Sequence, residues 1–316
     1  MQTPTRLNLY ISQSGLCSRR KADTLILNGE ITVNHWPMKD VGYMVQEKDT
    51  VRYGKAIIKP EKLTYVLLNK PTSVITAVED QFNRPTVVNL VKGKDITGRI
   101  YPVGRLDYDT SGVLILTNDG DLAQVLAHPK SEVQKVYRVT LKEDLAFDDA
   151  AKLKKGVFLT DGGARVDSLH QGYKKNVAQV TIHSGRNRII RRMFESLGYT
   201  VKKLERVIFA GLTTRDVKLG DWRFLTPAEV KKLQMLEIPG KKTASGAKKK
   251  TTGTKKTTGL GSKKVTSLET TLKEFVPVSK RKSAPSKRLA RKPAGKGRGS
   301  KKRAPSRTAK RSPKRK

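Results

Sequence analysis

The chain has 316 residues, and its 66 Lys and Arg against 28 Asp and Glu give a net charge of +38. Such an excess of positive charge indicates an acidic polymer, above all a nucleic acid, as the partner. The single cysteine, Cys17, excludes an internal disulfide and a multi-cysteine metal site, and the four histidines lack ligand spacing. There is no apolar run of the roughly 18 residues that span a membrane, and no signal peptide at the N-terminus. We therefore expect a cytoplasmic protein with no membrane contact and no metal site.

The charge is concentrated at the C-terminal end. Residues 241–316 hold 28 Lys and Arg against two acids, Glu269 and Glu274, a balance of +26 that leaves +12 for the first 240 residues. This tail has few apolar residues and is rich in Gly, Pro, Ser and Thr, so we expect it to be disordered. Composition thus divides the chain into residues 1–60, 61–240 and the tail 241–316.

Residues 1–60 predict a small α+β domain. The stretch RLNLYISQSG predicts a short helix, and SRRKADTLILNGE predicts a second one with Ser18 as its N-cap, followed by short strands. Arg19, Arg20 and Lys21 lie on the first turn of that second helix. Positive charge there opposes the helix dipole. A phosphate contact explains this placement better than a merely solvated face does.

Residues 61–240 alternate between strand-like and helix-like runs. The strand-like runs are LTYVLLNKP, SVITAV, GVLILTN, KVYRVTL, ARVDSLHQGY and VAQVTIHSG, and the helix-like runs are GDLAQVLAHP, FDDAAKLKKG and NRIIRRMFESLGY. Strands outnumber helices and come in clusters, which favours an α+β domain with a mixed, mainly antiparallel sheet over a doubly wound one. About 180 residues suffice to bury a core.

The stretch VGRLDYDTSG places Asp107 and Asp109 in a turn directly before the apolar run VLIL. An aspartate in such a place is most often a turn former or cap, so the residues alone favour that interpretation. Two carboxylates could also perform general acid–base chemistry. However, side chains two residues apart diverge, so Asp109 is read as the turn residue.

Several motifs in order resemble the bacterial ribosomal-RNA pseudouridine synthases. They are LLNKP at 67–71, GRLDYDTSGVLILTNDGDLAQVLAHP at 104–129, KVYRV at 135–139 and GRNRIIRRMFESLGYTVKKLERVIFAGL at 185–212. The first 60 residues resemble the RNA-binding module at the front of these enzymes and of a small-subunit ribosomal protein. The resemblance covers about residues 1–235 and implies the pseudouridine synthase fold.

The resemblance implies catalytic roles for Asp107, Tyr137 and Arg191. Asp107 is the expected nucleophile, since a carboxylate is ionised at neutral pH and can begin the reaction without a cofactor. Arg191 is expected beside Asp107, where it would keep the carboxylate charged. Tyr137 is expected to stack on the displaced uracil, although a core tyrosine is the alternative from sequence alone.

Further residues are expected around the pocket and on the RNA. Leu204 is expected beneath the base, with plain core packing as the alternative, and Arg105 on the base or its phosphate, with a surface salt bridge as the alternative. Asn69 and Lys70, with Pro71, are expected at the pocket rim. The expected RNA-binding residues are Arg6, Ser18, Arg19, Arg20, Lys21, Arg84 and Arg188. The chain departs from the family pattern at three positions, having His35 instead of glycine, Ser184 instead of glutamate and Ile189 instead of glutamine.

The expected function is therefore the isomerisation of a specific uridine in ribosomal RNA by base flipping. NRPTVVNLV and LAHPKSEVQKVY favour large-subunit over small-subunit RNA. The alternative is a non-catalytic RNA-binding factor for ribosome assembly, and assembly intermediates are possible partners of either. We expect a monomer whose tail anchors it to RNA, the rival roles of the tail being a general nucleic-acid arm and a nuclear-import signal.

Overall fold

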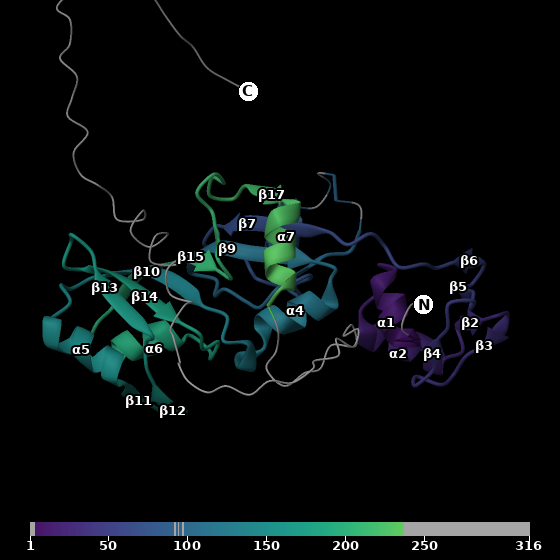
Figure 1. Ribbon diagram of the computed structural model, residues 1–316, viewed down its shortest axis with the longest axis horizontal. Coiled ribbons are helices and arrows are strands. Elements are labelled where there is room, and N and C mark those ends of the chain that lie inside the picture. The colour runs from purple at the N-terminus through teal and green to yellow at the C-terminus, as the bar shows by residue number, and fades with distance from the viewer. Residues whose placement is uncertain (1–3, 92, 94, 97, 237–316) are drawn as a thin grey trace, which may run out of the picture. The chain divides into compact units, whose positions relative to one another are not determined.

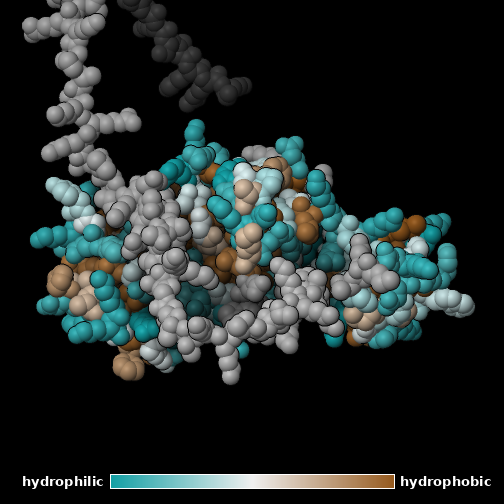
Figure 2. Space-filling model, viewed as in Figure 1, coloured by the Kyte–Doolittle hydropathy of each residue, from teal (hydrophilic) through white to brown (hydrophobic). Residues whose placement is uncertain are grey.

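The computed structural model describes residues 4–91, 93, 95–96 and 98–236. The expectation of a disordered tail over 241–316 lies outside the described residues. Among those described, no helix is long and apolar enough to cross a membrane. On the face shown in Figure 2, hydrophilic residues cover most of the described surface, and hydrophobic ones form scattered patches rather than one apolar face.

The first 60 residues form two helices and a set of short strands (Figure 1). In chain order these are β1 (Thr5–Arg6), α1 (Leu7–Gln13), α2 (Arg19–Leu27), β2 (Ile31–Val33), β3 (Trp36–Pro37), β4 (Met44–Val45), β5 (Val51–Tyr53) and β6 (Ala56–Ile57). The antiparallel order is β3-β2-β5-β6, with β1 paired to β4. Ser18 caps α2 as predicted, since its side chain accepts a hydrogen bond from the Lys21 amide. The apolar residues of this region bury a cluster of their own, so a boundary near residue 60 stays a prediction consistent with the packing.

A large sheet dominates the rest of the described chain. Its elements are β7 (Tyr65–Lys70), α3 (Val87–Val91), β8 (Tyr101–Pro102), β9 (Thr110–Thr117), α4 (Gly120–Ala127), the 3₁₀ helix Pro129–Ser131, β10 (Lys135–Leu141), α5 (Phe147–Lys155), β13 (Ser168–Gln171), β14 (Val177–Ile182), α6 (Ile189–Glu195), β15 (Val201–Phe209), β16 (Leu212–Thr213), β17 (Trp222–Phe224) and α7 (Pro227–Gln234). A separate hairpin pairs β11 (Val157–Leu159) with β12 (Gly162–Ala164).

The sheet has the strand order β13-β14-β10-β15-β9-β7-β17, with β16 and β8 paired at its sides. Every ladder in it is antiparallel except β15–β9, which is parallel. The expected α+β fold with a mixed, mainly antiparallel sheet is therefore confirmed.

Both faces of the sheet are covered, because alternate residues of its central strands enter two different cores. Leu68 and Leu114 belong to the core that includes buried residues of α5 and α6, whereas Leu67 and Val113 belong to the core that includes those of α4 and α7. Figure 1 shows the same arrangement, with α5 and α6 beside β10, β13 and β14, and α4 and α7 beside β7 and β9. The apolar run that follows Asp107 and Asp109 thus forms β9, a strand that is buried on both sides.

One predicted strand is absent. SVITAV forms only an isolated bridge between Ile75 and Thr86 instead of a strand. The Thr76 hydroxyl donates to the Leu106 carbonyl at 2.7 Å, and the Leu106 amide donates back to that hydroxyl at 3.3 Å. The segment therefore supports the loop before Asp107, a tertiary role that its strand-like composition does not reveal.

Candidate active site

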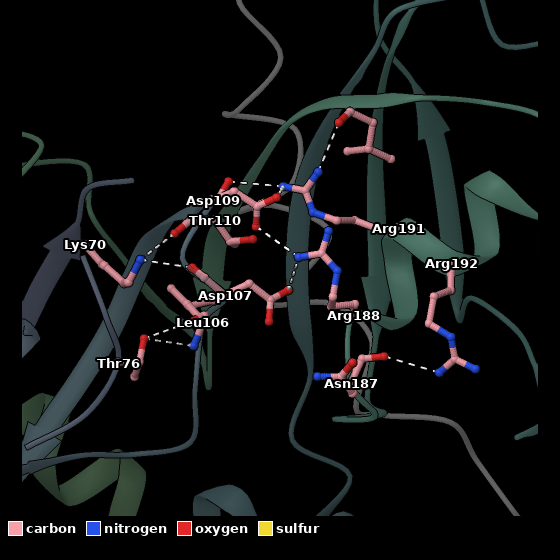
Figure 3. Close-up of polar contacts among 11 residues, drawn as sticks. Lys70, Thr76, Leu106, Asp107, Asp109, Thr110, Asn187, Arg188, Arg191 and Arg192 are labelled. Carbon is pink, nitrogen blue, oxygen red and sulfur yellow. Dashed lines mark hydrogen bonds and ion pairs between the residues drawn. The ribbon is translucent and has the colours of Figure 1, made fainter. Parts of the chain in front are cut away.

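A backbone hydrogen bond closes the turn that carries Asp107, so the Asp107 side chain is not needed to form the turn. The Thr110 amide donates to the Asp107 carbonyl at 3.1 Å, which closes a turn with Tyr108 and Asp109 at its centre. The strand β9 begins at Thr110. The Asp107 side chain is 32% exposed and points away from these backbone contacts (Figure 3). The predicted turn is thus present, and it presents a carboxylate to solvent at the start of a buried strand.

Lys70 anchors this turn from below. Its ammonium donates to the carbonyls of Pro71 and Asp107, both at 3.1 Å, and of Thr110 at 2.9 Å. An ammonium has three N–H groups, so all three are used. Lys70 is fully buried, and burial lowers its pKa to about 8 although the nearby carboxylates of Asp107 and Asp109 raise it.

Asn69 and Lys70, which were expected at the pocket rim, lie at the end of β7. Neither lines the cavity beside Asp107, because β7 is covered on both faces and their side chains reach other backbone segments instead. The Asn69 amide nitrogen donates to the Val217 carbonyl at 2.9 Å, which ties the end of β7 to the segment before β17. Both residues therefore support the site without lining the cavity.

The expected pair of Arg191 with Asp107 is replaced by a pair with Asp109. The Arg191 guanidinium lies 3.0 Å from the Asp109 carboxylate and donates to the Asp109 and Val201 carbonyls at 3.1 and 3.0 Å. Arg188 approaches both acids, at 3.3 Å from Asp109 and 3.8 Å from Asp107 (Figure 3). Asp109 is thus an ion-pair partner as well as a turn residue, and Arg188 is the arginine paired with Asp107.

A cavity of about 240 Å³ is lined by Asp107. Its lining includes four more of the expected residues, namely Arg105, Tyr137, Arg188 and Leu204. Strand register brings Tyr137 and Leu204 together, because Val139, two residues after Tyr137, pairs with Leu204 across β10 and β15. Leu204 in turn pairs with Thr110 across β15 and β9, close to Asp107. The volume suits one small ring rather than a drug-sized ligand.

The cavity also contains cationic residues that were not expected there, Lys135, Arg186 and Arg206. Lys135 donates to the carbonyls of Val133 at 3.2 Å and His183 at 2.7 Å, and burial lowers its pKa to about 8. Arg186 donates to the carbonyls of Asp161 and Gly163 in the β11–β12 hairpin. The alternation of side chains in a strand could have indicated Lys135 and Arg206, which lie two residues from Tyr137 and Leu204.

The departures from the family pattern fall at defined places. Ile189 and Ser184 line the cavity, where the buried Ile189 adds apolar surface. His35 lies in the turn between β2 and β3 with a φ of 75°, in the left-handed region that favours glycine.

The residues expected to bind RNA are exposed, although Arg84 and Arg188 also form ion pairs within the chain. Arg6, Arg19, Arg20 and Lys21 are exposed, and the first turn of α2 holds no acid. Arg84, in contrast, makes hydrogen bonds of 3.0 and 2.8 Å with the Asp80 carboxylate and lies over the Phe82 ring, 5.0 Å from its centroid. The ion pair with Asp80, for which the sequence predicted no role, therefore orders the loop that carries Arg84.

Comparison with known proteins identifies the class to which this fold and cavity belong. The family model for RNA pseudouridylate synthases matches residues 64–196, and that for the S4 domain matches residues 5–51. The chain belongs to the RNA pseudouridine synthases, as its motifs predicted, and is an isomerase.

Similar proteins cover nearly all of the region before the tail. The ribosomal large subunit pseudouridine synthase B of Bacillus subtilis (strain 168) is 42% identical over 241 residues, 75% of this chain and 98% of that protein. The dual-specificity RNA pseudouridine synthase RluF of Escherichia coli O157:H7 is 36% identical over 236 residues, 71% of this chain and 77% of its own. A crystal structure of a pseudouridylate synthase superposes with a TM-score of 0.52 at 26% identity, covering 72% of this chain and 99% of that one.

Proposed function

We propose that this enzyme converts a uridine of large-subunit ribosomal RNA to pseudouridine, with Asp107 as the reacting carboxylate. The observation that carries the proposal is the position of this side chain, which is partly exposed at a cavity that also holds Tyr137 and Leu204. The substrate is proposed from the Bacillus subtilis relative, whose name gives the large ribosomal subunit.

The chemistry requires a base that has left its stack. The bond between N1 of the uracil and C1′ of the ribose breaks, and C1′ joins C5 of the same base. Because C5 lies two ring positions from N1, the base must be extruded and turned within an enclosed site so that C5 faces C1′. Tyr137 and Leu204 lie on adjacent strands in the lining, where an aromatic ring and an apolar side chain can hold the two faces of the uracil.

The surrounding cations have separate roles in this proposal. Arg188 lies 3.8 Å from Asp107 and forms an ion pair with it, whereas Arg191 positions the turn through Asp109. The exposed Arg105 at the cavity contacts the phosphate of the extruded nucleotide. The exposed basic residues of α2 bind RNA outside the cavity. The protein acts as a cytoplasmic monomer, either on RNA or on an assembly intermediate.

The test maps pseudouridine in protein-free ribosomal RNA from cells that lack this protein. We expect wild-type protein to modify a defined uridine of the large-subunit RNA and Asp107→Asn to lower the single-turnover rate constant at least 1,000-fold, roughly the loss expected for a nucleophile. Asp148→Asn, which removes an exposed carboxylate of α5, is the matched control and should act like wild type. Product in small-subunit RNA alone would correct the substrate, and an active Asp107→Asn would exclude Asp107 as the reacting group.

A further inference from the structure

Arg206 is a buried cation that the reaction as described above does not use. It is 2% exposed, and its Nε donates to the Val113 carbonyl at 2.8 Å while the guanidinium lies 4.3 Å from the centroid of the Phe209 ring. No carboxylate among the described residues forms an ion pair with it, and its Nη2 is buried with no hydrogen-bond partner. A buried charge without a carboxylate partner is unfavourable for folding, which suggests that its partner is a ligand.

A second buried polar atom without a partner lines the same cavity. The hydroxyl oxygen of Thr110 makes no hydrogen bond with any described residue. Thr110 pairs with Leu204 in the parallel ladder of β9 and β15, and Arg206 pairs with Gly112 two rungs further along. The two unpaired groups, a guanidinium donor and a hydroxyl, thus belong to neighbouring strands that line one small cavity.

The charge around this cavity is positive beyond what Asp107 requires. Burial and, to a smaller extent, the charge of Arg206 lower the pKa of Lys70 and of Lys135 to about 8. Burial also lowers the pKa of Arg206 itself, which the nearby Tyr137 side chain partly offsets. Positive charge that is costly in the empty cavity becomes favourable when negative charge develops there.

Uracil fits both unpaired groups. Its ring carries two carbonyl oxygens and an N3–H donor, and the cleavage of the glycosidic bond leaves the electron pair of that bond on the ring. The resulting uracilate spreads its negative charge over N1 and the two carbonyl oxygens. As the N1–C1′ bond breaks, a carboxylate oxygen of Asp107 forms an ester bond to C1′. C5 of the turned ring then attacks C1′ and displaces the carboxylate, and the C5 proton is released as N1 is protonated. The isomerisation thus balances without another reactant.

We propose that Arg206 donates from Nη2 to a carbonyl oxygen of the target uracil, with the Thr110 hydroxyl accepting from N3–H, so that both groups recognise the base and Arg206 stabilises its anion. The assignment rests on the proposed function and adds to it a catalytic residue and the groups that select uracil. Cytosine carries an amino group in place of the C4 carbonyl oxygen, so it cannot accept from Arg206 at that position, whereas the Thr110 hydroxyl can bond either ring.

The decisive variant is Arg206→Met, compared with Arg206→Lys and with Arg138→Met as the matched control. Arg138 lies one residue after Tyr137 in β10, pairs with the partly exposed Glu205, and does not line the cavity. We expect Arg206→Met to lower the single-turnover rate constant about 100-fold, to change the Kd for RNA less than threefold, and to leave Tm unchanged or raised, since a buried charge is removed. Arg206→Lys should recover at least tenfold of the lost rate, and Arg138→Met should retain the wild-type rate.

A purely structural role gives a different pattern, in which Arg206→Met lowers Tm and Arg206→Lys restores no rate. Should Arg206→Met fail to fold, Thr110→Val decides the question, because it removes the unpaired hydroxyl at constant volume. We expect Thr110→Val to lower the rate about tenfold with Tm unchanged or raised. Full activity of the folded Arg206→Met or Thr110→Val variant overturns the corresponding contact.

Modified substrates identify the contact itself. RNA with 2-thiouridine or 4-thiouridine at the target replaces one carbonyl oxygen by sulfur, a poorer acceptor. Wild type should react more slowly with at least one of the two modified RNAs. For that RNA, the loss in rate caused by the sulfur should be about tenfold smaller in Arg206→Lys or Arg206→Met. Additive effects of the variant and the sulfur for both RNAs would overturn the proposed hydrogen bond. The Asp107→Asn variant separates this proposal from the proposed function. If wild type yields no pseudouridine, both proposals are contradicted. If Asp107→Asn is inactive while Arg206→Met is fully active, only the role of Arg206 is contradicted.

Discussion

Asp107 and Asp109 are separated by one residue, yet their surroundings differ. Asp109 binds Arg191 at 3.0 Å and Arg188 at 3.3 Å, whereas the ion pair of Asp107 is with Arg188 at 3.8 Å. Because Arg191 also donates to the Asp109 carbonyl, it fixes the turn through both the side chain and the backbone. The less tightly paired carboxylate is the one beside the cavity, as expected of a group that must react.

The Asp109–Arg191 pair should therefore couple in stability and in rate. We expect Asp109→Asn and Arg191→Met to show a coupling of about 1 kcal/mol in the free energy of unfolding, since Asp109 is partly exposed while Arg191 is buried. Each single variant should lower the single-turnover rate about tenfold, and the double variant should lower it little further. Urea unfolding and rate measurements on the three variants check this, and strictly additive effects would contradict the pairing.

Lys70 should give the enzyme a pH dependence. Its pKa is lowered from 10.5 to about 8, so the three-donor ammonium is present below pH 8 and the two-donor amine above it. We therefore expect the single-turnover rate constant to fall as the pH rises through about 8, because one of the three carbonyls of the turn loses its donor. Lys70→Met should be less active and lack this fall.

The control for Lys70 is Lys135→Met, because the pKa of Lys135 is also lowered to about 8. A fall in rate that persists in Lys70→Met and disappears in Lys135→Met would assign the pH dependence to Lys135.

The lowered pKa of Lys70 also makes the free energy of unfolding depend on pH. The unfolded chain holds the Lys70 proton between about pH 8 and 10.5 and the folded chain does not, so this group's contribution to the unfolding free energy rises with pH over that window.

At the scale of elements, β9 and β15 approach closely at Gly112. Its φ is 109°, and a Cβ atom there would overlap the Arg206 carbonyl oxygen and lie 2.8 Å from the Arg206 nitrogen. We expect Gly112→Ala to cost more than about 3 kcal/mol of unfolding free energy, since both the dihedral angle and the close approach are violated. Gly163→Ala, where nothing lies within 4 Å, should change it by less than about 0.5 kcal/mol in the same urea titration. Equal losses of unfolding free energy in the two variants would show that the close approach of β9 and β15 does not require glycine at position 112.

The hairpin of β2 and β3 turns through Asn34 and His35, with φ values of 51° and 75°. Two positive φ values in a two-residue connection match the turn that favours Asn-Gly. We expect His35→Gly to raise the unfolding free energy by about 1 kcal/mol, which thermal unfolding of the full chain measures. A lower Tm would show that the His35 side chain contributes more than the backbone strain costs.

At the scale of the whole molecule, charge is divided unevenly along the chain. The 28 Lys and Arg of residues 241–316 outnumber two acids, while the relatives match the region before them. Each phosphate that a basic residue neutralises releases counterions. The loss of one such contact therefore lowers the slope of the logarithm of the binding constant against the logarithm of the salt concentration by about 0.7 to 0.9.

We therefore expect deletion of 241–316 to weaken RNA binding and to lower this slope by several units. The single-turnover rate at saturating RNA should stay unchanged. Binding titrations between 50 and 300 mM salt, roughly the range where such slopes are measured, test this, with a tail of equal length and Gln for Lys and Arg as control. An unchanged slope would show that the tail does not bind the RNA.

The sequence by itself determined the family, the α+β class and five of the residues around the cavity, Asp107 among them. Ordered motifs carry this information, and local patterns predict β10, β14 and α6 because alternation and helical periodicity are written in neighbouring residues. The tertiary structure alone decided the partners. Arg191 and Asp109 are 82 positions apart, and Arg206 and Val113 are 93 apart. The parallel register of β9 against β15 and the burial of β7 on both faces place these groups, which is why Arg191 binds Asp109, Lys70 lies beneath the turn, and Arg206 faces the cavity with an unused donor.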